Sequence, residues 1–253
     1  MSSRSPFSSS VARKINRSIG KAIHQYHMIS DGDKIAVGIS GGCDSLTLLW
    51  FLIHRLPRIP VQYELVCIHI DPGFDNGFSP LLKKYAHELG ISLHVEYTDY
   101  GILAHGPENR ENPCFLCARL RRKRIFEIAE QHGCNKIAFG HNKDDLIETL
   151  MINMLYAGEI SSMLPSQPFF QGKLTVIRPL AYTDSDLIRL FVQSFQLPVC
   201  INPCPSSKTS HRSEVRDMLT HLYQKNRKIK GNLFRAIHNV KTEYLLPASG
   251  KIT

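Results

Sequence analysis

The sequence lacks a long apolar run. Its longest largely apolar stretch, residues 46–53, ends at His54 and Arg55 and is too short for a helix that spans a bilayer, which needs about 20 residues. No apolar segment typical of a secretory signal precedes it, so we expect a cytoplasmic protein with no membrane contact. No internal repeat occurs, and the only low-complexity stretch is the serine-rich segment 1–10, which we expect to be a loose tail.

Acidic residues are scarce: 22 Asp and Glu stand against 31 Lys and Arg, for a net charge of +9. The excess is concentrated in two blocks, residues 119–124 and 208–241, the second with nine basic residues against Glu214 and Asp217. Each block alone fits a solvated helix face as well as it fits a binding surface. Together the two blocks favour a polyanionic substrate, with RNA the leading candidate. The candidate RNA contacts are Arg119, Arg122, Lys225, Arg227, Lys228 and Lys230.

Strands and helices alternate along the 253 residues, 43% of which are hydrophobic. Short apolar segments predict five strands, at 34–39, 64–70, 92–97, 136–140 and 174–178. Predicted helices lie at 45–56, 79–89, 119–132, 144–156 and 184–196, with further helices at 11–28 and, broken near Lys230–Gly231, over 211–246; residues 97–113 are predicted to be a loop. This βαβ order predicts an α/β, Rossmann-like parallel five-stranded sheet with helices on both faces, plus N- and C-terminal helices.

A glycine-rich turn, Ser40-Gly41-Gly42-Cys43-Asp44-Ser45, joins the first predicted strand to the first core helix. Adjacent glycines let the backbone approach a phosphate closely, and the new helix directs its N–H groups and positive dipole end at the anion. Asp44 can hold a magnesium ion shared with the phosphates. The turn is neither a Walker A loop nor a dinucleotide fingerprint. A plain strand-to-helix turn is the alternative interpretation.

Seven cysteines, an odd number, favour a reducing compartment in which clustered thiols bind metal or perform chemistry. Cys114 and Cys117 form a CxxC pair at the predicted start of the helix that carries the first basic block, where the helix dipole and nearby guanidinium groups favour thiolates. By itself the pair could be a redox dithiol, half of a zinc site, or without a role. Cys67 and Cys134 are predicted to be structural, and the role of Cys200 stays open.

The SGGxDS turn at 40–45 resembles the signature of the PP-loop ATPases, and the GHxxDDxxET run at 140–149 resembles their tRNA-modifying branch. Together with PCFLCARLRR at 113–122, IRPLAY at 177–182 and Cys204 eight residues before Arg212, these segments resemble the tRNA 2-thiocytidine synthetase (TtcA) family over roughly residues 12–246. Members split ATP between its α and β phosphates, adenylate the base, and let sulfur displace AMP.

The resemblance implies that Cys114, Cys117 and Cys204 hold a 4Fe-4S cluster with one iron free to carry sulfur. It implies ATP and Mg2+ as cofactors, with ATP bound by residues 40–45, Gly140 and His141, and with Asp44 and Asp144 as catalytic residues. It also implies a homodimer, tRNA thiolated at cytidine 32, and a sulfur donor such as a cysteine desulfurase. On this basis we predict an N-terminal tail and helix (1–29), a catalytic domain (30–200) and a C-terminal extension (201–253).

Two positions depart from the family pattern. Cys43 stands where lysine is usual, so Arg121 or Lys143 has to compensate, and Pro205 replaces a glycine. Relatives that make 2-thiouridine carry zinc ribbons with paired CxxC motifs, and this chain has only one such motif. Two alternatives stay open: a PP-loop enzyme of another specificity, of 2-thiouridine or lysidine type, that uses a persulfide or structural zinc, and a non-catalytic nucleotide-binding module that regulates a partner.

Overall fold

The computed structural model describes residues 6–74, 77–201, 203–208 and 211–246. The chain divides into two compact units, the first formed by residues 1–145 and 164–210 and the second by residues 146–163 and 211–253. No helix in the described ranges is both long and apolar enough to cross a membrane.

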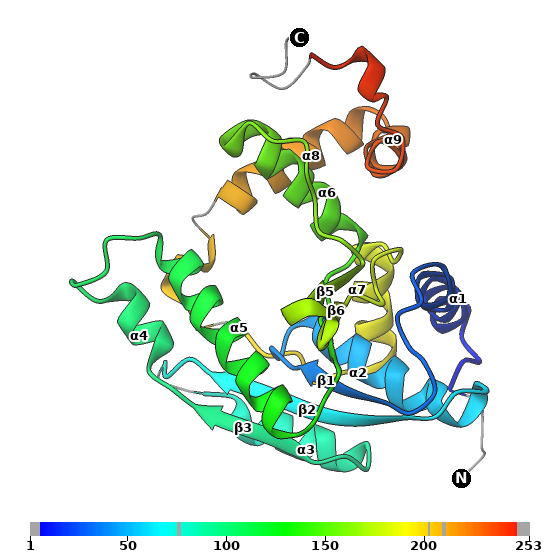
Figure 1. Cartoon of the computed structure of the whole chain (residues 1–253), viewed down its shortest axis with the longest axis vertical. Coiled ribbons are helices and arrows are strands. Elements are labelled where there is room, and N and C mark those ends of the chain that lie inside the picture. Colours follow the sequence, from blue (N-terminus) through cyan, green and yellow to red (C-terminus); the bar gives the residue numbers. More distant parts are fainter. Residues whose placement is uncertain (1–5, 75–76, 202, 209–210, 247–253) are drawn as a thin grey trace. The chain divides into compact units, whose positions relative to one another are not determined.

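The first unit contains the sheet, which has six strands, and most of the helices (Figure 1). Its strands are β1 (Asp33–Gly38), β2 (Tyr63–Asp71), β3 (Leu93–Tyr97), β4 (Lys136–Ala138), β5 (Ser166–Phe169) and β6 (Leu174–Ile177). Its helices are α1 (Ser10–Gln25), α2 (Cys43–Arg55), α3 (Ser79–Glu88), α4 (Tyr100–His105), α5 (Pro113–Gln131), the first turn of α6 (Lys143–Ile152) and α7 (Ser185–Phe195), with 3-10 turns at Leu56–Arg58, Phe170–Gly172 and Pro205–Lys208.

The strand order is β3-β2-β1-β4-β6-β5, and every pair is parallel except β5 with β6. The Rossmann-like fold is confirmed, but the predicted count of five strands is wrong because β5 adds an antiparallel edge. Its sequence, Ser-Gln-Pro-Phe, carries no apolar alternation, and the proline lacks an N–H donor, which restricts such a segment to an edge. β1 lies between β2 and β4, so the loops that follow β1 and β4 meet where the strand order reverses.

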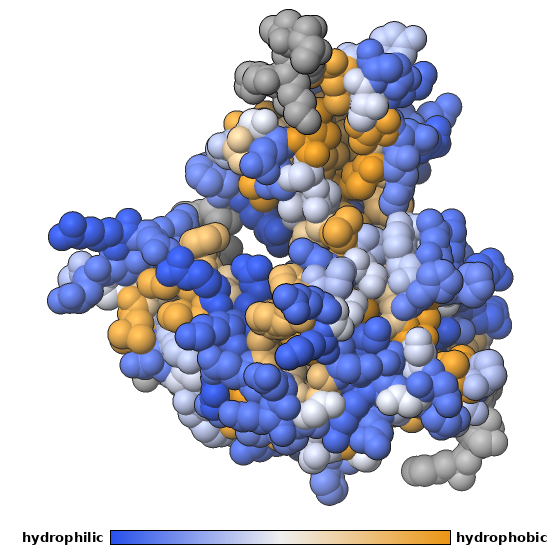
Figure 2. Space-filling view, in the orientation of Figure 1, coloured by the Kyte–Doolittle hydropathy of each residue, from blue (hydrophilic) through white to orange (hydrophobic). Residues whose placement is uncertain are grey.

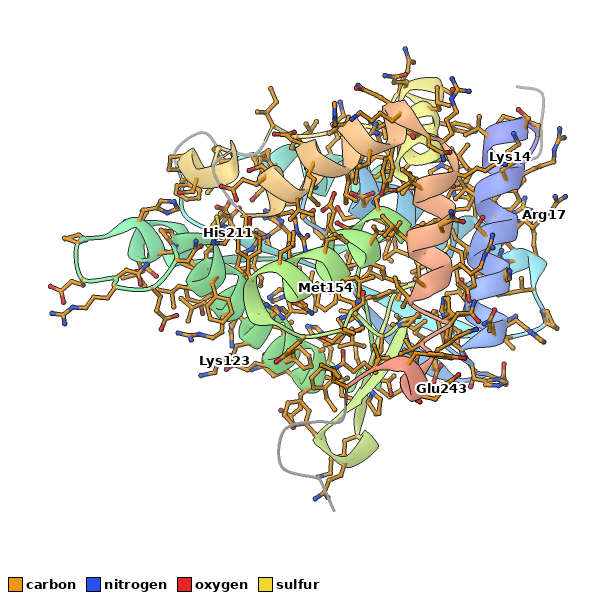
Figure 3. The ribbon with its side chains drawn as sticks, turned by 90° about the horizontal axis from the view of Figure 1, so that it is seen from above. Lys14, Arg17, Lys123, Met154, His211 and Glu243 are labelled. Atoms are coloured by element: carbon orange, nitrogen blue, oxygen red, sulfur yellow. The ribbon has the colours of Figure 1, made fainter. Side chains whose placement is uncertain are left out.

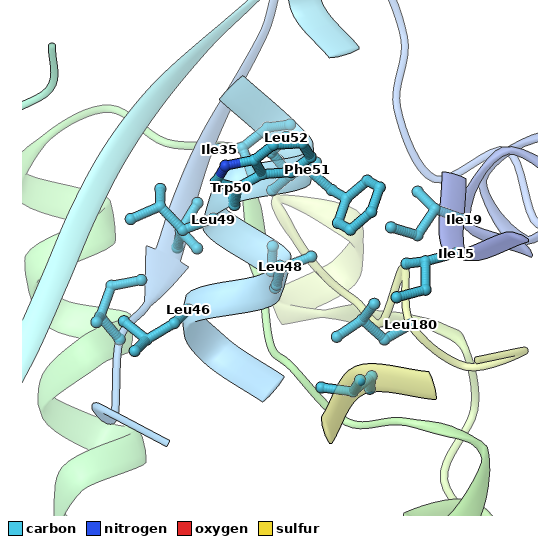
Figure 4. Packing of buried hydrophobic residues seen from close by; sticks show 14 of the residues in the cluster. Ile15, Ile19, Ile35, Leu46, Leu48, Leu49, Trp50, Phe51, Leu52 and Leu180 are labelled. Carbon is cyan, nitrogen blue, oxygen red and sulfur yellow. The ribbon is translucent and has the colours of Figure 1, made fainter. Parts of the chain in front are cut away.

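Helices cover both faces of the sheet. Ile35 and Val37 of β1 belong to the cluster that includes buried residues of α1, α2 and α7, while Ala36 belongs to the cluster on the α5 side. This is the alternation that a strand buried on both faces shows. Figure 4 shows the first cluster, where α2 contributes a nearly continuous run of buried side chains from Leu46 to Leu52.

Two helix boundaries differ from the prediction and affect the site. The segment predicted as a loop at 97–113 contains the short helix α4, and α5 starts at Pro113 rather than at residue 119. Asn112 caps α5, since its side chain accepts hydrogen bonds from the backbone N–H groups of Cys114 (3.0 Å) and Phe115 (3.3 Å). The CxxC pair therefore lies in the first helical turns.

The second unit contains the rest of α6, a π-helical turn (Asn153–Ala157), α8 (His211–Lys225), α9 (Lys228–Ala236) and a 3-10 turn (Thr242–Tyr244). Ile147, Val215 and Leu219 form its core. The predicted helix break at Lys230–Gly231 is wrong, because the break falls at Asn226, whose side chain accepts from the N–H of Lys228 at 2.9 Å. Gly231 lies inside α9.

Candidate functional site

The glycine-rich turn at 40–45 has the geometry of an anion-binding loop. Gly41 has a positive φ of 79°, and Gly42 is the N-cap of α2 with no side chain capping that end. The first N–H groups of the helix are therefore not taken by a capping side chain, and the helix dipole makes this end attractive to phosphate. Ser45 fixes the turn, since its Oγ accepts from the N–H of Ser40 and donates to the carbonyl of Gly42, both at 3.1 Å.

The loops after β1 and β4 touch directly. A side-chain carbon at Gly140 would lie 2.9 Å from the carbonyl carbon of Asp44 and from the backbone nitrogen of Ser45, so only glycine fits. Asn142, which is buried, donates from Nδ2 to Oδ1 of Asp44 at 2.8 Å. Its own Oδ1 accepts from the N–H groups of Asp144 (2.8 Å) and Asp145 (3.2 Å) and so caps α6. One amide thus joins the two predicted ATP motifs.

Burial raises the pKa of Asp44, and the negative charge of Asp144 raises it further, against the hydrogen bond from Asn142 and the charge of Arg189, which lower it. Two carboxylates that repel each other in a partly buried setting are suited to bind a divalent cation, which would neutralise both charges. Asp144 also has a structural contact, since its Oδ2 accepts from the N–H of Ser185 at the start of α7 at 2.8 Å.

The missing lysine at position 43 has no direct replacement in the loop. Burial and the neighbouring carboxylate of Asp44 raise the pKa of the Cys43 thiol, which is therefore neutral at pH 7. Of the two predicted substitutes, Lys143 forms an ion pair with Asp184 at 3.1 Å, while Arg121 lies close enough to Cys117 to lower the pKa of that thiol. Burial lowers the pKa of His69, and Arg121 also lowers it; Nδ1 of His69 lies 2.7 Å from the carbonyl oxygen of Ile39, the residue before the loop.

Cys114, Cys117 and Cys204 gather at the start of α5 although Cys204 comes from a distant segment. Burial raises the pKa of Cys114 and Cys117, and Cys204 raises it further, so the three thiols lie close enough to interact electrostatically. Sγ of Cys114 lies 3.8 Å from the carbonyl oxygen of Ser206, and Sγ of Cys204 lies 3.9 Å from Nε2 of His105. The expectation that the helix dipole and arginines favour thiolates is wrong for Cys114 and Cys117, because burial raises the pKa of both thiols and, at Cys117, outweighs the lowering by Arg121.

Within the described ranges, no three His, Cys, Asp or Glu side chains lie close enough to bind one metal ion. Thiols that bind three different irons of a cluster need a wider spacing than ligands of a single ion. Cys114, Cys117 and Cys204 supply three thiols in a partly buried setting, which is the donor set of a 4Fe-4S cluster with three protein ligands. They are the residues that would hold it.

Cys200 lies at the phosphate loop. Its N–H donates to the carbonyl of Gly41 at 2.9 Å, and its Cβ would be 3.1 Å from a side-chain carbon added at Gly41. Burial alone raises its pKa, with no contribution from the other cysteines. The sequence left open whether Cys200 is a fourth ligand, and these contacts favour a role in shaping the loop.

Hydrophilic side chains cover most of the visible face of the first unit in Figure 2, and its basic residues differ in their partners. Arg119 forms an exposed ion pair with Glu111 at 3.1 Å, and Arg122 is exposed, with a hydrogen bond of 3.4 Å to the carbonyl of Ala118. In the side-chain view of Figure 3, Lys14 and Arg17 point outward from α1. In the second unit, Lys225, Arg227 and Lys228 are exposed, whereas Lys230 is half-buried with its Nζ over the ring of Tyr223.

Three residues at the site carry interactions that the sequence patterns did not assign. Asn142 stands inside the GHxxDD run at a position that the motif leaves free, and His105 lies in the segment predicted as a loop. Arg178 follows β6 directly and is buried at 8% exposure. Two signals were available: the IRPLAY segment at 177–182, which contains Arg178, and the position of Arg178 at the end of a strand.

Comparison with known proteins places these features in a family. The PP-loop domain model matches residues 9–223. The tRNA-cytidine(32) 2-sulfurtransferase of Geotalea daltonii is 40% identical over 237 residues, covering 92% of this chain and 94% of that protein. The protein of the same name from Geobacter sulfurreducens is 39% identical, with 92% of each chain covered.

Two solved structures have a similar fold. The U34-tRNA thiolase NcsA from Methanococcus maripaludis, solved with its [4Fe-4S] cluster, has a TM-score of 0.76 and 25% identity, with 93% of this chain and 80% of that chain covered. The NH3-dependent NAD synthetase from Campylobacter jejuni has a TM-score of 0.51 at 13% identity, covering 93% of this chain and 96% of that chain, and shows the shared fold alone.

Proposed function

Because this chain belongs to the tRNA-cytidine(32) 2-sulfurtransferase family of PP-loop proteins, we propose that it uses ATP to replace the C2 oxygen of cytidine 32 in tRNA with sulfur. The observation that carries the proposal is the gathering of an anion-binding loop with a carboxylate pair and of a three-cysteine site in one unit. The finer parts of the proposal are a cytoplasmic homodimer and a sulfur donor such as a cysteine desulfurase.

ATP binds with its phosphates over residues 40–45, where the first N–H groups of α2 meet the anion. Asp44 and Asp144 would hold a magnesium ion, which would neutralise negative charge on the phosphates. Asn142 fixes the orientation of Asp44 and the start of the second motif in one contact. The nucleotide site is completed by Ser40, Ser45, Gly140 and His141. At position 43 it has the uncharged thiol of a cysteine in place of a lysine.

The reaction needs two substitutions. The C2 oxygen of cytosine attacks the α-phosphorus of ATP, pyrophosphate leaves, and the base carries an O-adenylate. A hydrosulfide equivalent then attacks C2, the C2–O bond breaks, and AMP leaves with that oxygen, so one oxygen is exchanged for one sulfur with no net oxidation. Cys114, Cys117 and Cys204 would hold a 4Fe-4S cluster, which would supply the sulfur for this second substitution.

The base has to leave its stack to reach the loop, which is least costly in a single-stranded region such as the anticodon loop. Basic side chains then contact the phosphate backbone of the RNA and position it without reading its sequence. Candidates are Arg119 and Arg122 on α5 and, on the second unit, the exposed Lys225, Arg227 and Lys228. Lys230 is a weaker candidate because it packs on Tyr223.

ATP labelled at the α-phosphate tests the proposal. In anaerobic incubations with tRNA and sulfide, we expect labelled AMP and free pyrophosphate rather than ADP, and we expect release to fall to background when cytidine 32 of the same tRNA is changed to uridine. Equal release with both tRNAs would favour the other specificity, since the structural neighbour from Methanococcus maripaludis is a U34-tRNA thiolase. Absence of any tRNA-stimulated release would instead favour a regulatory module.

A further inference from the structure

Arg178 is a buried cation without a buried anion. It is 8% exposed, and no Asp or Glu in the described parts of the chain forms an ion pair with it. Burial, and then the positive charge of Arg122, lower the pKa of its guanidinium to about 10, so it stays charged at pH 7. Buried charges in proteins are normally paired, because removing an unpaired ion from water is costly.

The two hydrogen bonds of Arg178 leave its charge uncompensated. Nε donates to Nδ1 of His141 at 3.2 Å, and Nη1 donates to the carbonyl of Leu164; both acceptors are neutral. Within the described residues, Nη2 has no recorded hydrogen bond and is not fully buried, so a ligand can reach it.

These groups lie at the ligand-binding edge of the sheet. Arg178 follows β6 and His141 follows β4, which are neighbouring parallel strands, and the adjacent Gly140 touches the end of the phosphate loop. Arg122, from α5, is exposed and close enough to influence Arg178 electrostatically. An arginine with an open guanidinium edge is suited to the oxygens of a phosphate, which it can bind in bidentate fashion.

We propose that Arg178 and Arg122 form a second anion site, separate from the 40–45 loop, that binds a backbone phosphate of the RNA next to the base to be modified. The inference rests on the proposed function for the identity of the ligand. RNA is favoured over the nucleotide because the phosphates of ATP already have the N-terminus of α2, and because the exposed Arg122 leaves one side of the site open to a large substrate.

The test compares Arg122→Gln and Arg178→Gln with the control Lys123→Gln. Lys123 lies on the same helix (Figure 3), its side chain is 76% exposed, and its only recorded ion pair, to Glu127, is long at 3.9 Å. Binding of tRNA is titrated at several potassium chloride concentrations, and binding of Mg-ATP is measured without RNA. We expect each arginine variant to bind tRNA about tenfold more weakly, with a salt slope smaller by about 0.7 to 0.9, and to bind ATP normally. Lys123→Gln should match wild type.

Two results would overturn the assignment. Weaker ATP binding in Arg122→Gln would place a nucleotide phosphate at the site, and unchanged tRNA and ATP binding in both variants would leave Arg178 as a structural residue. If circular dichroism shows that Arg178→Gln does not fold, the exposed Arg122 carries the test alone. The proposed function fails separately: a wild-type protein that binds tRNA with the expected slope but makes no thiolated cytidine would refute the activity and leave the phosphate site intact.

Discussion

Replacing Gly140 by alanine should separate the two nucleotide motifs. The added carbon would lie 2.9 Å from two backbone atoms of Asp44 and Ser45 and 3.1 Å from the carbonyl oxygen of Asp44. Ordinary contact begins near 3.4 Å, so one of the two loops has to move by about 0.5 Å. Because both neighbours are backbone, no side-chain rotation can relieve the contact. Overpacking of this kind costs about 1–3 kcal/mol, and each kcal/mol lowers the Tm of a chain of this size by about 2–4 °C.

The activity should fall more than the stability. A displacement of about 1 Å can cost a reaction about 100-fold, so half of that is expected to cost about tenfold in the rate of AMP release. The matched control is Gly20→Ala in α1, where the nearest atom is the flexible guanidinium of Arg55 at 3.4 Å; it should keep its activity and lose no stability. Thermal melts and AMP release are measured on both variants. A Gly140→Ala protein with wild-type Tm and activity would refute this reading of the loop contact.

Three further outcomes follow from the site. Asp44→Asn should abolish thiolation yet raise the Tm at pH 7, because a carboxyl group with a raised pKa stabilises the fold only while it is protonated. The gain in Tm should therefore vanish below the ordinary pKa of 3.8. A lower Tm at pH 7 would contradict the burial argument. Serine at Cys114, Cys117 or Cys204 should remove iron and sulfide from anaerobically purified protein, whereas serine at Cys67 or Cys134 should not; loss in Cys200→Ser with full content in Cys204→Ser would reassign the third ligand. Glutamine at Lys225, Arg227 and Lys228 together should flatten the salt dependence of tRNA binding by about 0.7–0.9 per lost phosphate contact. Equal slopes for the triple variant and wild type would exclude this surface.

Features with a local signal were predictable from the sequence. The apolar strands before residues 40 and 140, and the glycines and polar residues that follow them, predict a parallel sheet with ligand loops at its carboxyl edge, and the structure has this arrangement. β5 was missed because a short polar strand with Pro168 depends on pairing with β6 rather than on its own pattern. α4 was missed because six residues carry too little periodicity.

Contacts between distant segments could not be read from the sequence. Asn142 meets Asp44 across 98 positions, and Sγ of Cys204 meets His105 across 99. The charge state of Cys114 and Cys117 was misjudged for a related reason: the helix start and the arginines were visible in the sequence, but the burial that raises the pKa of both thiols was not. Arg178 shows the same limit, since an arginine after a strand is unremarkable until its lack of a carboxylate partner is known.

Mass spectrometry of nucleosides tests the central claim most directly. Purified tRNA is incubated without oxygen with the iron- and sulfide-loaded protein, Mg-ATP and sulfide, then digested and analysed, with parallel reactions that omit ATP or use Asp44→Asn. The account predicts 2-thiocytidine in the complete reaction only, at position 32 when fragments are sequenced. Unmodified cytidine in the complete reaction, from loaded protein that binds both tRNA and ATP, would contradict it, as would sulfur found on uridine instead.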